Sequence, residues 1–443
     1  MNERQAMEYI EWASSLGIAP GLDSIRKLCR RLGDPQKNLR FVHIAGTNGK
    51  GSVSAYIASI LQTAGYKVGR YISPVIFEYR ERIQVNGRMI TRKALCQGLS
   101  QIKAACDEMV SEGHPQPTPF EIETALGFLY FLEKACDIVV LETGMGGLLD
   151  ATNIVENTVT AVFTSISRDH MNFLGNSLEE IAKQKAGVIK FGCAVVSANQ
   201  ESKVLEVLCH RAEELGCTVT VADAGKNSEK LSRVHYGLDR QSFDYGSLKR
   251  LEITLAGRYQ VENAVLAVEA VNALRQKGFS VTEEQLRRGL RDTQWPGRFT
   301  IVKKHPLFIV DGAHNEDAAK RLAESVTFYF TNRKIIYIMG VLKDKEYEKI
   351  IALTHAYADH IITVTAPGNP RALSAYELAQ EVAKVHPKVT AADSLEEAVE
   401  MSFLLAGSED VIIAFGSLSY LGRLMEIVGV PSGKAAKRNG RSK

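Results

Sequence analysis

The stretch FVHIAGTNGKGS, residues 41–52, decides the fold. Its apolar start predicts a buried parallel strand, and the residues after Ser52 repeat apolar side chains with helical spacing. A glycine-rich turn that ends in Lys50, Gly51 and Ser52 joins the two. Backbone N–H groups of such a turn, the helix dipole and a lysine bind phosphate together, and a hydroxyl can reach a magnesium ion. The stretch therefore predicts a nucleotide triphosphate site.

The turn departs from the common phosphate-loop pattern G-x-x-x-x-G-K-[ST]. Ile44 occupies the place of the first glycine, and Gly51 separates Lys50 from Ser52. A glycine-rich surface turn is the structural alternative, but it needs neither the buried strand before it nor the amphipathic helix after it. We therefore favour a phosphate site made of Gly46, Thr47, Asn48, Gly49, Lys50, Gly51 and Ser52.

Length and composition indicate a reduced, soluble protein with two domains, because 443 residues exceed the size of a single core. The formal charge of +3 depends on the tail 431–443, whose five basic residues leave the body at about −2. This gives no nucleic-acid signature. Seven scattered cysteines without a C-x-x-C spacing are typical of the cytoplasm. We found neither a signal peptide nor a membrane-spanning stretch in the sequence.

Two further apolar strands are predicted at 137–142 and 158–166, and chemically useful side chains stand at their ends. Glu142 closes the first strand, and His170 follows the second. Ser73 follows another short strand. Ligands of an open parallel sheet bind beyond the carboxyl ends of its strands. We therefore expect Ser73, Glu142 and His170 to share one edge with the glycine turn.

The second half of the chain alternates strand and helix patterns after the sequence WPGR at 295–298. This alternation predicts a second α/β domain with a parallel sheet. Residues 223–256 are polar and weakly alternating, which is typical of a small peripheral sheet. The predicted domains are residues 1–296 and 297–430, followed by a disordered basic tail at 431–443.

Magnesium is expected beside a bound triphosphate, because the charge must be offset where phosphoryl transfer occurs. Ser73, Glu142 and His170 can supply part of its shell, and water completes it. Taken singly, a solvated carboxylate and a hydrogen-bonded loop histidine are equally good interpretations of Glu142 and His170. Their joint position after two buried strands favours the metal site.

Asp311 and His314 follow a strand of the second domain and can hold the ribose or base if the domains close on the nucleotide. A helix N-cap is the alternative for Asp311 or for Asn315. Lys185 lies in a predicted helix at 177–190, where lysines are normally solvated. These residues do not distinguish a ligase from a kinase or a hydrolase. A Rossmann dehydrogenase is disfavoured, because G-x-G-x-x-G is absent from the first strand-to-helix turn.

From about Gly21 to about Tyr420, the sequence resembles the folylpolyglutamate synthase and dihydrofolate synthase family, a branch of the Mur ligase superfamily. The resemblance implies an α/β fold, with an N-terminal P-loop-type ATPase domain around a parallel central sheet and a smaller, Rossmann-like C-terminal domain. The segments that carry it are HIAGTNGKGS (43–52), SPVIFEYRERI (73–83), ETGMGGLLDATN (142–153), DHMNFLG (169–175), KQKAGVIK (183–190) and DGAHN (311–315).

The resemblance also implies roles for single residues. Lys50, His170 and Lys185 would be catalytic, and Lys185 falls where the family carries a carbamylated lysine, whose carbamate can face a metal or orient a phosphate. Magnesium would be held by Ser52, Ser73, Glu142 and His170. Nucleotide contacts beyond the glycine turn would come from Asn263, Arg298, Asp311 and His314. The pterin substrate would contact Leu22, Asp23, Arg82, Thr118, Leu149, Asp150 and Ala151.

Two positions depart from the family pattern. Val75 replaces the usual histidine, and Leu148 replaces the usual arginine of the second glycine-rich segment. Both fall near the folate and metal region rather than in the phosphate turn. They therefore bear on substrate preference and leave ATP use intact.

The implied reaction is ATP- and magnesium-dependent amide ligation. A carboxylate of a folate or of dihydropteroate attacks the γ-phosphate, and the amine of L-glutamate then displaces phosphate from the acyl phosphate. A Mur-type ligase acting on a peptidoglycan precursor is the nearest alternative, and a nucleotide-dependent switch is an alternative from another class. The expected protein is a cytoplasmic monomer without nucleic-acid or membrane partners.

Overall fold

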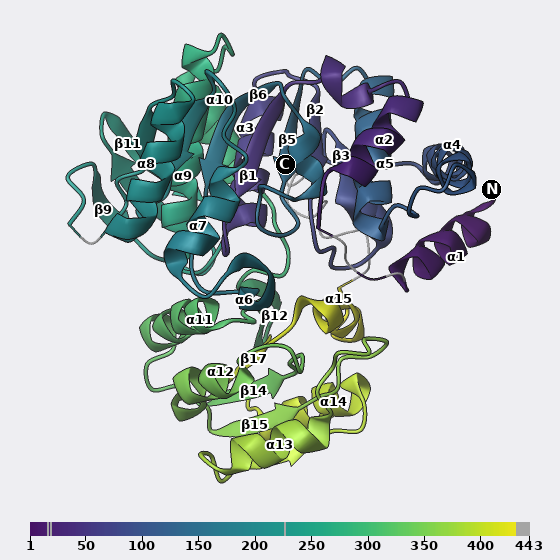
Figure 1. The fold of residues 1–443 in the computed structure, drawn as a ribbon. Helices are drawn as coiled ribbons and strands as arrows, with labels where there is room; N and C mark the ends of the chain where they lie inside the picture. Colours follow the sequence, from purple (N-terminus) through teal and green to yellow (C-terminus); the bar gives the residue numbers. More distant parts are fainter. Residues whose placement is uncertain (16, 18–19, 226, 431–443) are drawn as a thin grey trace, which may run out of the picture.

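The chain folds into two lobes that lie one above the other in Figure 1. The computed structural model describes residues 1–15, 17, 20–225 and 227–430, so the predicted tail lies outside the described residues. The upper lobe holds two sheets and most of the helices, and the lower lobe, coloured green to yellow, holds the third sheet. The α/β architecture expected from the alternation of strands and helices is confirmed.

The large sheet of the upper lobe has the strand order β4-β3-β2-β5-β1-β6-β7-β8. All neighbouring pairs from β2 to β8 are parallel, as predicted for the centre of this sheet. The edge differs, because Asn86 and Gly87 both have positive φ and form a tight hairpin turn that makes β3 and β4 antiparallel. The strands are β1 (Phe41–Ala45), β2 (Val68–Tyr71), β3 (Ile83–Val85), β4 (Arg88–Met89), β5 (Ile138–Glu142), β6 (Thr158–Phe163), β7 (Ala194–Ser197) and β8 (Val219–Val221).

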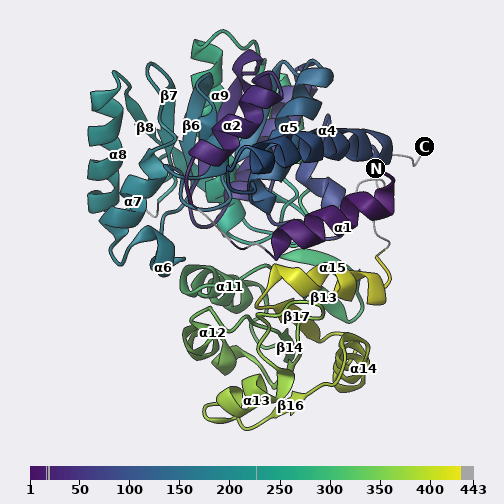
Figure 2. The same ribbon diagram turned by 45° about the vertical axis from the view of Figure 1, so that its right-hand side comes forward.

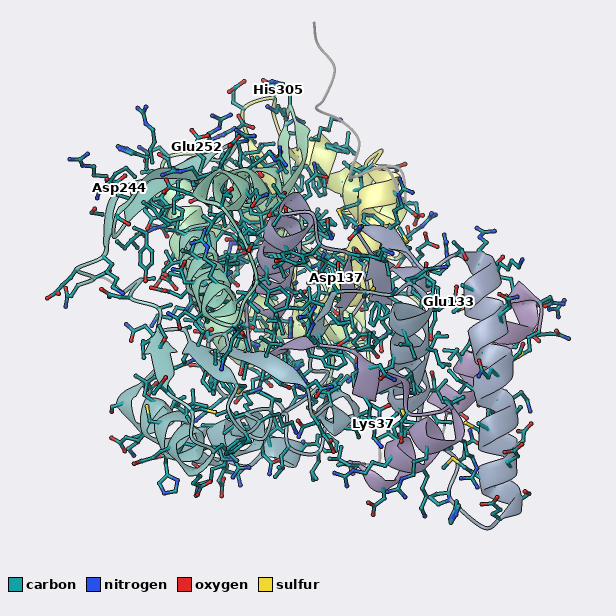
Figure 3. The ribbon with its side chains drawn as sticks, turned by 90° about the horizontal axis from the view of Figure 1, so that it is seen from above. Lys37, Glu133, Asp137, Asp244, Glu252 and His305 are labelled. Atoms are coloured by element: carbon teal, nitrogen blue, oxygen red, sulfur yellow. The ribbon has the colours of Figure 1, made fainter. Side chains whose placement is uncertain are left out.

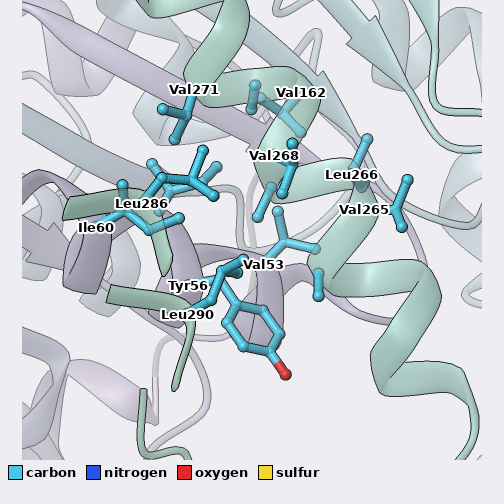
Figure 4. Close-up of a cluster of buried hydrophobic side chains, with 14 of the residues drawn as sticks. Val53, Tyr56, Ile60, Val162, Val265, Leu266, Val268, Val271, Leu286 and Leu290 are labelled. Atoms are coloured by element: carbon cyan, nitrogen blue, oxygen red, sulfur yellow. The ribbon is translucent and has the colours of Figure 1, made fainter. Parts of the chain in front are cut away.

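Helices cover both faces of the large sheet. Three pack on one face: α3 (Lys50–Thr63), α9 (Tyr259–Gln276) and α10 (Glu283–Asp292). Figure 4 shows the apolar contact of this face, where Val53, Tyr56 and Ile60 of α3 meet side chains of α9 and α10. The other face is covered by α1 (Glu3–Ser14), α2 (Asp23–Arg31), α4 (Arg92–Ser111), α5 (Pro119–Glu133), α7 (Leu178–Ala186) and α8 (Ser202–Glu214).

Side chains of β1 alternate between the two faces of the large sheet, so this strand contributes to the cores on both faces. Val42 and Ile44 point into the core under α3, whereas Phe41 and Ala45 belong to the cores of the opposite face. Every residue of β1 is buried, as expected for a central parallel strand. The carboxyl end of this strand is where the glycine turn begins, so the fold places the turn at the edge of the sheet that faces the second lobe.

A small antiparallel sheet lies at the outer side of the upper lobe, as the pattern of residues 223–256 predicted. Its order is β11-β10-β9, with β9 (Leu231–His235), β10 (Gln241–Tyr245) and β11 (Leu248–Ile253). Seen from above, Asp244 and Glu252 of this sheet lie at the periphery, while Asp137, just before β5, lies near the middle of the view (Figure 3). Asp137 lies at the amino end of β5, and the glycine turn lies at the opposite, carboxyl edge of the large sheet.

The second lobe has a six-stranded sheet of order β12-β13-β17-β14-β15-β16. Only the edge pair of β12 with β13 is antiparallel. The strands are β12 (Thr300–Lys304), β13 (Leu307–Val310), β14 (Ile335–Met339), β15 (His360–Thr363), β16 (Val389–Ala391) and β17 (Val411–Phe415). One face packs on α11 (Glu316–Tyr329), α12 (Tyr347–Thr354) and α13 (Ala375–Ala383), and the other on α14 (Leu395–Leu405) and α15 (Leu418–Ile427), as Figure 2 shows from a second side.

Two elements are shorter than predicted. The helix expected at 177–190 ends at Ala186. Gly187 follows it, and a Cβ there would collide with the backbone of Leu148, so the chain turns away at this close approach. The strand expected at 158–166 ends at Phe163, and the following residues leave the sheet to line the glycine turn. Among the described residues, the helices are too short or too polar to span a bilayer.

The close contact of α15 with the upper lobe gives a first prediction. Gly422 lies within α15, and a Cβ there would collide with the carbonyl oxygen of Ile76, a backbone atom of the other lobe. Glycine to alanine within a helix normally stabilises by about 1 kcal/mol. Here we expect Gly422→Ala to lower the melting temperature and the activity instead, because the lobes must separate. Arg423→Ala, on the exposed side of the same helix, is the control and should leave both within error.

Candidate active site

A cavity of about 1050 Å³ lies between the carboxyl edge of the large sheet and the second lobe. It collects the last residue of β5 and residues from the segments that follow β1, β2 and β6 on one side, and residues from the loops after β13 and β14 on the other. The predicted site residues that line it are Gly46, Thr47, Asn48, Gly49, Lys50, Gly51, Ser52, Ser73, Arg82, Thr118, Glu142, Leu149, Asp150, Ala151, His170, Lys185, Asn263, Arg298, Asp311 and His314. The structure thus brings these residues to one cavity, including Ser73, Glu142 and His170 beside the glycine turn.

The glycine turn is tightly enclosed. Gly49 adopts φ +92° as the N-cap of α3, a conformation that glycine accepts without strain. A Cβ at Gly51 would lie 2.6 Å from the ring of Trp295, and one at Gly46 would collide with the hydroxyl of Thr164. The N–H of Thr47 donates to the carbonyl of Ser165 at 2.7 Å. The turn is therefore held open by its neighbours, with its remaining N–H groups at a helix N-terminus suited to anions.

Two lysines meet at the carbonyl oxygen of Gly46. Lys185 Nζ donates to it at 2.8 Å and Lys50 Nζ at 3.1 Å. Burial, together with the charge of Lys50, lowers the pKa of Lys185 to about 7. Burial also lowers the pKa of Lys50, although Glu142 and Asp169 partly offset this. The pair forms a positive spot beside the turn, and Lys185 is buried rather than solvated as a typical helical lysine would be.

Glu142 is a buried carboxylate, 4% exposed, at the end of β5. Its Oε2 has no hydrogen-bond partner among the described residues, while the backbone N–H of Ser73 donates to the carboxylate. Burial raises the pKa of Glu142, and Lys50, Arg70 and Arg298 counteract this. A buried carboxylate oxygen without a partner is costly unless a cation or a donor joins it.

The donors around Glu142 fit magnesium but supply only part of a shell. Ser52 Oγ accepts from Gln260 Nε2 at 3.2 Å, so its lone pairs are partly used. His170 begins α6 (Met171–Leu174) with φ +52°, and burial lowers its pKa to about 4. Within the described part of the chain, no three or more acidic, cysteine or histidine residues are arranged so that they alone could hold a metal ion. A magnesium ion here would depend on Glu142, hydroxyl oxygens, water and phosphate oxygens, which are its preferred ligands.

Asp311 is tied to the joint between the lobes. Its carboxylate accepts from Tyr259 Oη, from the N–H of Phe299 and from the N–H of Ala313, each at 2.8 Å. The N-cap of α11 is Asn315, whose side chain accepts from the N–H of Ala318. The helix N-cap interpretation is therefore confirmed for Asn315. Asp311 instead joins the first residue of α9, Tyr259, to the second lobe.

Arg298 and His314 stand beside Asp311 in the cavity wall. The guanidinium of Arg298 fills the space where a Cβ of Gly312 would be. His314 Nδ1 lies 2.7 Å from the carbonyl of Gly312, which accepts its proton and leaves Nε2 facing Asp169 at 3.9 Å. Burial lowers the pKa of His314 to about 4, so this imidazole is neutral near pH 7.

No local sequence pattern predicts the contacts that join the two lobes. Asn48 and Asn315 exchange two side-chain hydrogen bonds, of 3.2 and 3.1 Å. Asp169 accepts from Lys345 Nζ at 2.7 Å and from Asn315 Nδ2 at 3.0 Å, and Asn48 also donates to Asp317 at 2.8 Å. Burial raises the pKa of Asp169, but Lys345 and the two nearby histidines outweigh this and hold it well below its usual range. These contacts place the glycine turn directly against α11.

The substrate side of the cavity holds a buried ion pair. Arg82 Nε lies 3.3 Å from Glu123 Oε2, and both side chains are largely buried. Thr118 caps α5 through a reciprocal contact with Glu121. Leu149 is 46% exposed and borders the open part of the cavity. Arg82, Thr118 and Leu149 are thus positioned by α5 and by the glycine-rich segment after β5.

Leu22 and Asp23 are the exceptions among the predicted site residues, because neither lines the cavity. Leu22 precedes α2 and packs against the apolar core beneath the sheet. Asp23 is 95% exposed and pairs with Arg26 at 3.8 Å. Their placement follows from the helical period of α2, which turns Leu22 inward. Gly21 and Pro20 line the cavity in their stead.

Comparison with known proteins agrees with this geometry. The Mur ligase middle domain matches residues 44–271, and the Mur ligase, glutamate ligase domain matches residues 297–418. The fold and the two domain matches define a Mur-type ligase. The chain belongs to the folylpolyglutamate synthase and dihydrofolate synthase family of these ligases, because relatives of that name match it over nearly their whole length.

Three comparisons carry this assignment. The dihydrofolate synthase/folylpolyglutamate synthase of Bacillus subtilis is 36% identical over 429 residues, which cover 94% of this chain and 97% of that protein. The Escherichia coli protein of the same name is 30% identical, with 95% and 94% covered. The crystal structure of Mycobacterium tuberculosis folylpolyglutamate synthase complexed with ADP and AMPPCP has a TM-score of 0.89 at 28% identity, and the match covers 97% of this chain and 100% of that one.

Proposed function

We propose that this protein is an ATP-dependent ligase that adds L-glutamate to a folate and to dihydropteroate. The observation that carries the proposal is one cavity, lined by both lobes, that holds Lys50, Lys185 and an oxygen of Glu142 without a partner among the described residues. The named relatives support it, since several are described as both dihydrofolate and folylpolyglutamate synthases. An E. coli relative of 29% identity has been solved in complex with DHPP and ADP, which supports small-molecule substrates.

The reaction divides into two steps. A carboxylate oxygen of the acceptor attacks the γ-phosphorus of ATP, and the bond to ADP breaks, which gives an acyl phosphate. The nitrogen of L-glutamate then attacks the acyl carbon, loses a proton and displaces phosphate. Lys50 offsets charge on the transferred phosphoryl group, and the turn N–H groups hold the remaining phosphates. Closure of the lobes, divided as residues 1–296 and 297–430, keeps water from the acyl phosphate.

Magnesium would be held by Ser52, Ser73, Glu142 and His170, and would offset the phosphate charge when bound. The protein's own residues prepare this place. Ser73 orients the Glu142 carboxylate through its backbone N–H, and Gln260 orients the hydroxyl of Ser52. Asn263, Arg298, Asp311 and His314 would border the nucleotide, and Arg82, Thr118, Leu149, Asp150 and Ala151 would border the acceptor.

Lys185 gives a second prediction. With the pKa of its amine lowered to about 7 by burial, a large fraction is neutral at pH 7 to 8 and can add carbon dioxide as a carbamate. Because the neutral amine is the reactive form, we expect activity of bicarbonate-depleted enzyme to recover faster at pH 8 than at pH 6 when both samples receive the same concentration of dissolved carbon dioxide. Lys185→Ala should lose about 100-fold or more in kcat and regain part of it with short carboxylic acids. An identical recovery at both pH values would contradict a neutral-amine reaction.

Product analysis tests the function itself. Purified protein is incubated with ATP, magnesium and L-glutamate, and with dihydropteroate, tetrahydrofolate or a UDP-linked peptidoglycan precursor as acceptor. We expect added glutamyl units by mass spectrometry on the pteridine acceptors alone. Addition to the UDP-linked acid would favour the alternative Mur-type activity, and ATP turnover that needs no glutamate would contradict ligation. The same protein should run as a monomer in sedimentation.

A further inference from the structure

His43 is a buried histidine that the proposed chemistry does not use. It lies in the middle of β1, is 0% exposed and stands three residues before Gly46. Because side chains alternate along a strand, His43 points to the same face as Phe41 and Ala45, away from the core under α3. That face carries the segment after β5 that borders the acceptor side of the cavity.

A chain of hydrogen bonds runs from His43 to this segment. His43 Nε2 lies 2.9 Å from Thr152 Oγ1, and Thr152 Oγ1 donates to Asp150 Oδ1 at 2.5 Å. A hydroxyl has a single proton, and Thr152 donates it to Asp150, so the same hydroxyl must accept its bond from His43. This places the imidazole proton on Nε2. Nδ1 has no partner within the described residues, and burial lowers the pKa of His43 to about 3, so the ring is neutral.

Asp150 connects the hydrogen bonds of His43 and Thr152 to the glycine-rich segment at 144–150. Its Oδ1 also accepts from the N–H of Thr152 at 3.0 Å, and its Oδ2 accepts from the N–H of Met145 at 2.8 Å. These bonds close the segment on itself, and all its residues except Leu148 line the cavity. The carboxylate of Asp150 is thus occupied by the protein's own donors, which favours a supporting role over direct contact with the acceptor.

We propose that His43 is a positioning residue for the acceptor: through Thr152 and Asp150 it fixes the shape of segment 144–150. This proposal rests on the proposed function and adds to it the group that holds the acceptor side in place. The phosphate turn follows the carboxyl end of the same strand, so β1 positions both the phosphate turn and the segment at the acceptor side. The hydrogen bonds act at the acceptor side, and loss of them changes acceptor binding more than ATP binding.

Steady-state kinetics of three variants test the proposal. His43→Leu and Thr152→Val break the chain, and Thr152→Ser keeps its hydroxyl. For the first two we expect KM for the pteridine acceptor to rise about 10-fold or more, while KM for ATP stays within about twofold. Thr152→Ser should restore near wild-type values. The matched control is Thr160→Val, since Thr160 is a buried threonine of β6 whose hydroxyl has no partner among the described residues.

Hydrogen exchange provides a readout that needs no substrate. Amides of residues 143–150 should exchange faster in Thr152→Val and His43→Leu, and at the wild-type rate in Thr160→Val. Unchanged exchange in the first two, or equal rises of both KM values, would overturn the proposal. If His43→Leu does not fold, Thr152→Val alone decides. A wild-type protein that forms no glutamyl product would count against the proposed function only, because the exchange result stands without it.

Discussion

Lys50→Met is expected to lower kcat/KM for ATP about 1000-fold while leaving the protein at least as heat-stable as the wild type. The loss corresponds to about 4 kcal/mol of transition-state stabilisation, the scale of removing one preorganised charge from a phosphoryl-transfer site. The stability gain has a separate cause. Among the described residues, the Lys50 ammonium donates only to the carbonyls of Gly46 and Thr47, and burial lowers its pKa, so its charged form is costly while no phosphate is bound.

The two effects are measured independently. Kinetics with ATP give the first, and thermal unfolding with and without ADP gives the second, where the ADP-induced rise in melting temperature should shrink. Lys183→Met is the control, because Lys183 is an exposed lysine on α7 and its removal changes the net charge equally. A variant that melts earlier and still uses ATP normally would show that Lys50 is a structural residue, contrary to the proposal.

Local sequence patterns were sufficient to predict the strand, turn and helix at the start of the candidate site. The strand, the glycine turn and the helix follow each other without interruption, so their periodicity and the turn residues identify them directly. Glu142 and His170 could be assigned to the same edge because parallel strands end together, and the cavity contains both. These inferences need only the direction of each strand.

Contacts between the lobes could not be predicted in this way. Asn48 and Asn315 are 267 positions apart, and Lys345 lies 176 positions from Asp169, so no local period relates them. Asp311 shows a related limit. A carboxylate after a strand can bind a ligand, cap a helix or join two elements. In the folded protein, three donors of the chain itself bind the Asp311 carboxylate.

Leu22 and Asp23 show where roles assigned by resemblance to a family can fail. Carrying roles over by position assumes that a side chain points the same way, yet the first turn of α2 directs Leu22 into the core and Asp23 into solvent. Backbone neighbours such as Gly21 can still border the cavity. Positions in loops before a helix are therefore the ones where carried-over roles need the structure most.

Asp169→Asn is expected to open the lobes and to lower kcat/KM about 100-fold, which corresponds to about 2.7 kcal/mol. Asp169 and Lys345 are each only 10% exposed, and breaking a buried pair by removing one partner leaves an uncompensated charge. Because the pair joins two lobes that keep their own cores, the cost should appear as separation of the lobes rather than as unfolding. Small-angle scattering should show a larger radius of gyration, and Lys345→Met should act alike.

A double-mutant cycle decides whether the pair acts as a unit. If it does, Asp169→Asn combined with Lys345→Met should cost little more than either change alone, because no unpaired charge remains. Glu316→Gln is the control, since it removes an exposed ion pair with Lys349 in the same lobe, worth about 0 to 1 kcal/mol. Additive losses, or single variants with the wild-type radius of gyration, would contradict a closing role.

The pH dependence of closure follows from the same pair. Lys345 holds the pKa of Asp169 below its usual range against the opposing effect of burial, so folding and closure favour the ionised carboxylate. The stabilisation is complete above the carboxylate's ordinary pKa of about 4 and is lost as pH falls through the lowered value in the closed form. The wild type should therefore stay closed from pH 7 to pH 5 and open only in stronger acid. Asp169→Asn, which has no carboxylate to titrate, should lack the part of this transition that Asp169 contributes, and scattering across the same pH range measures the difference.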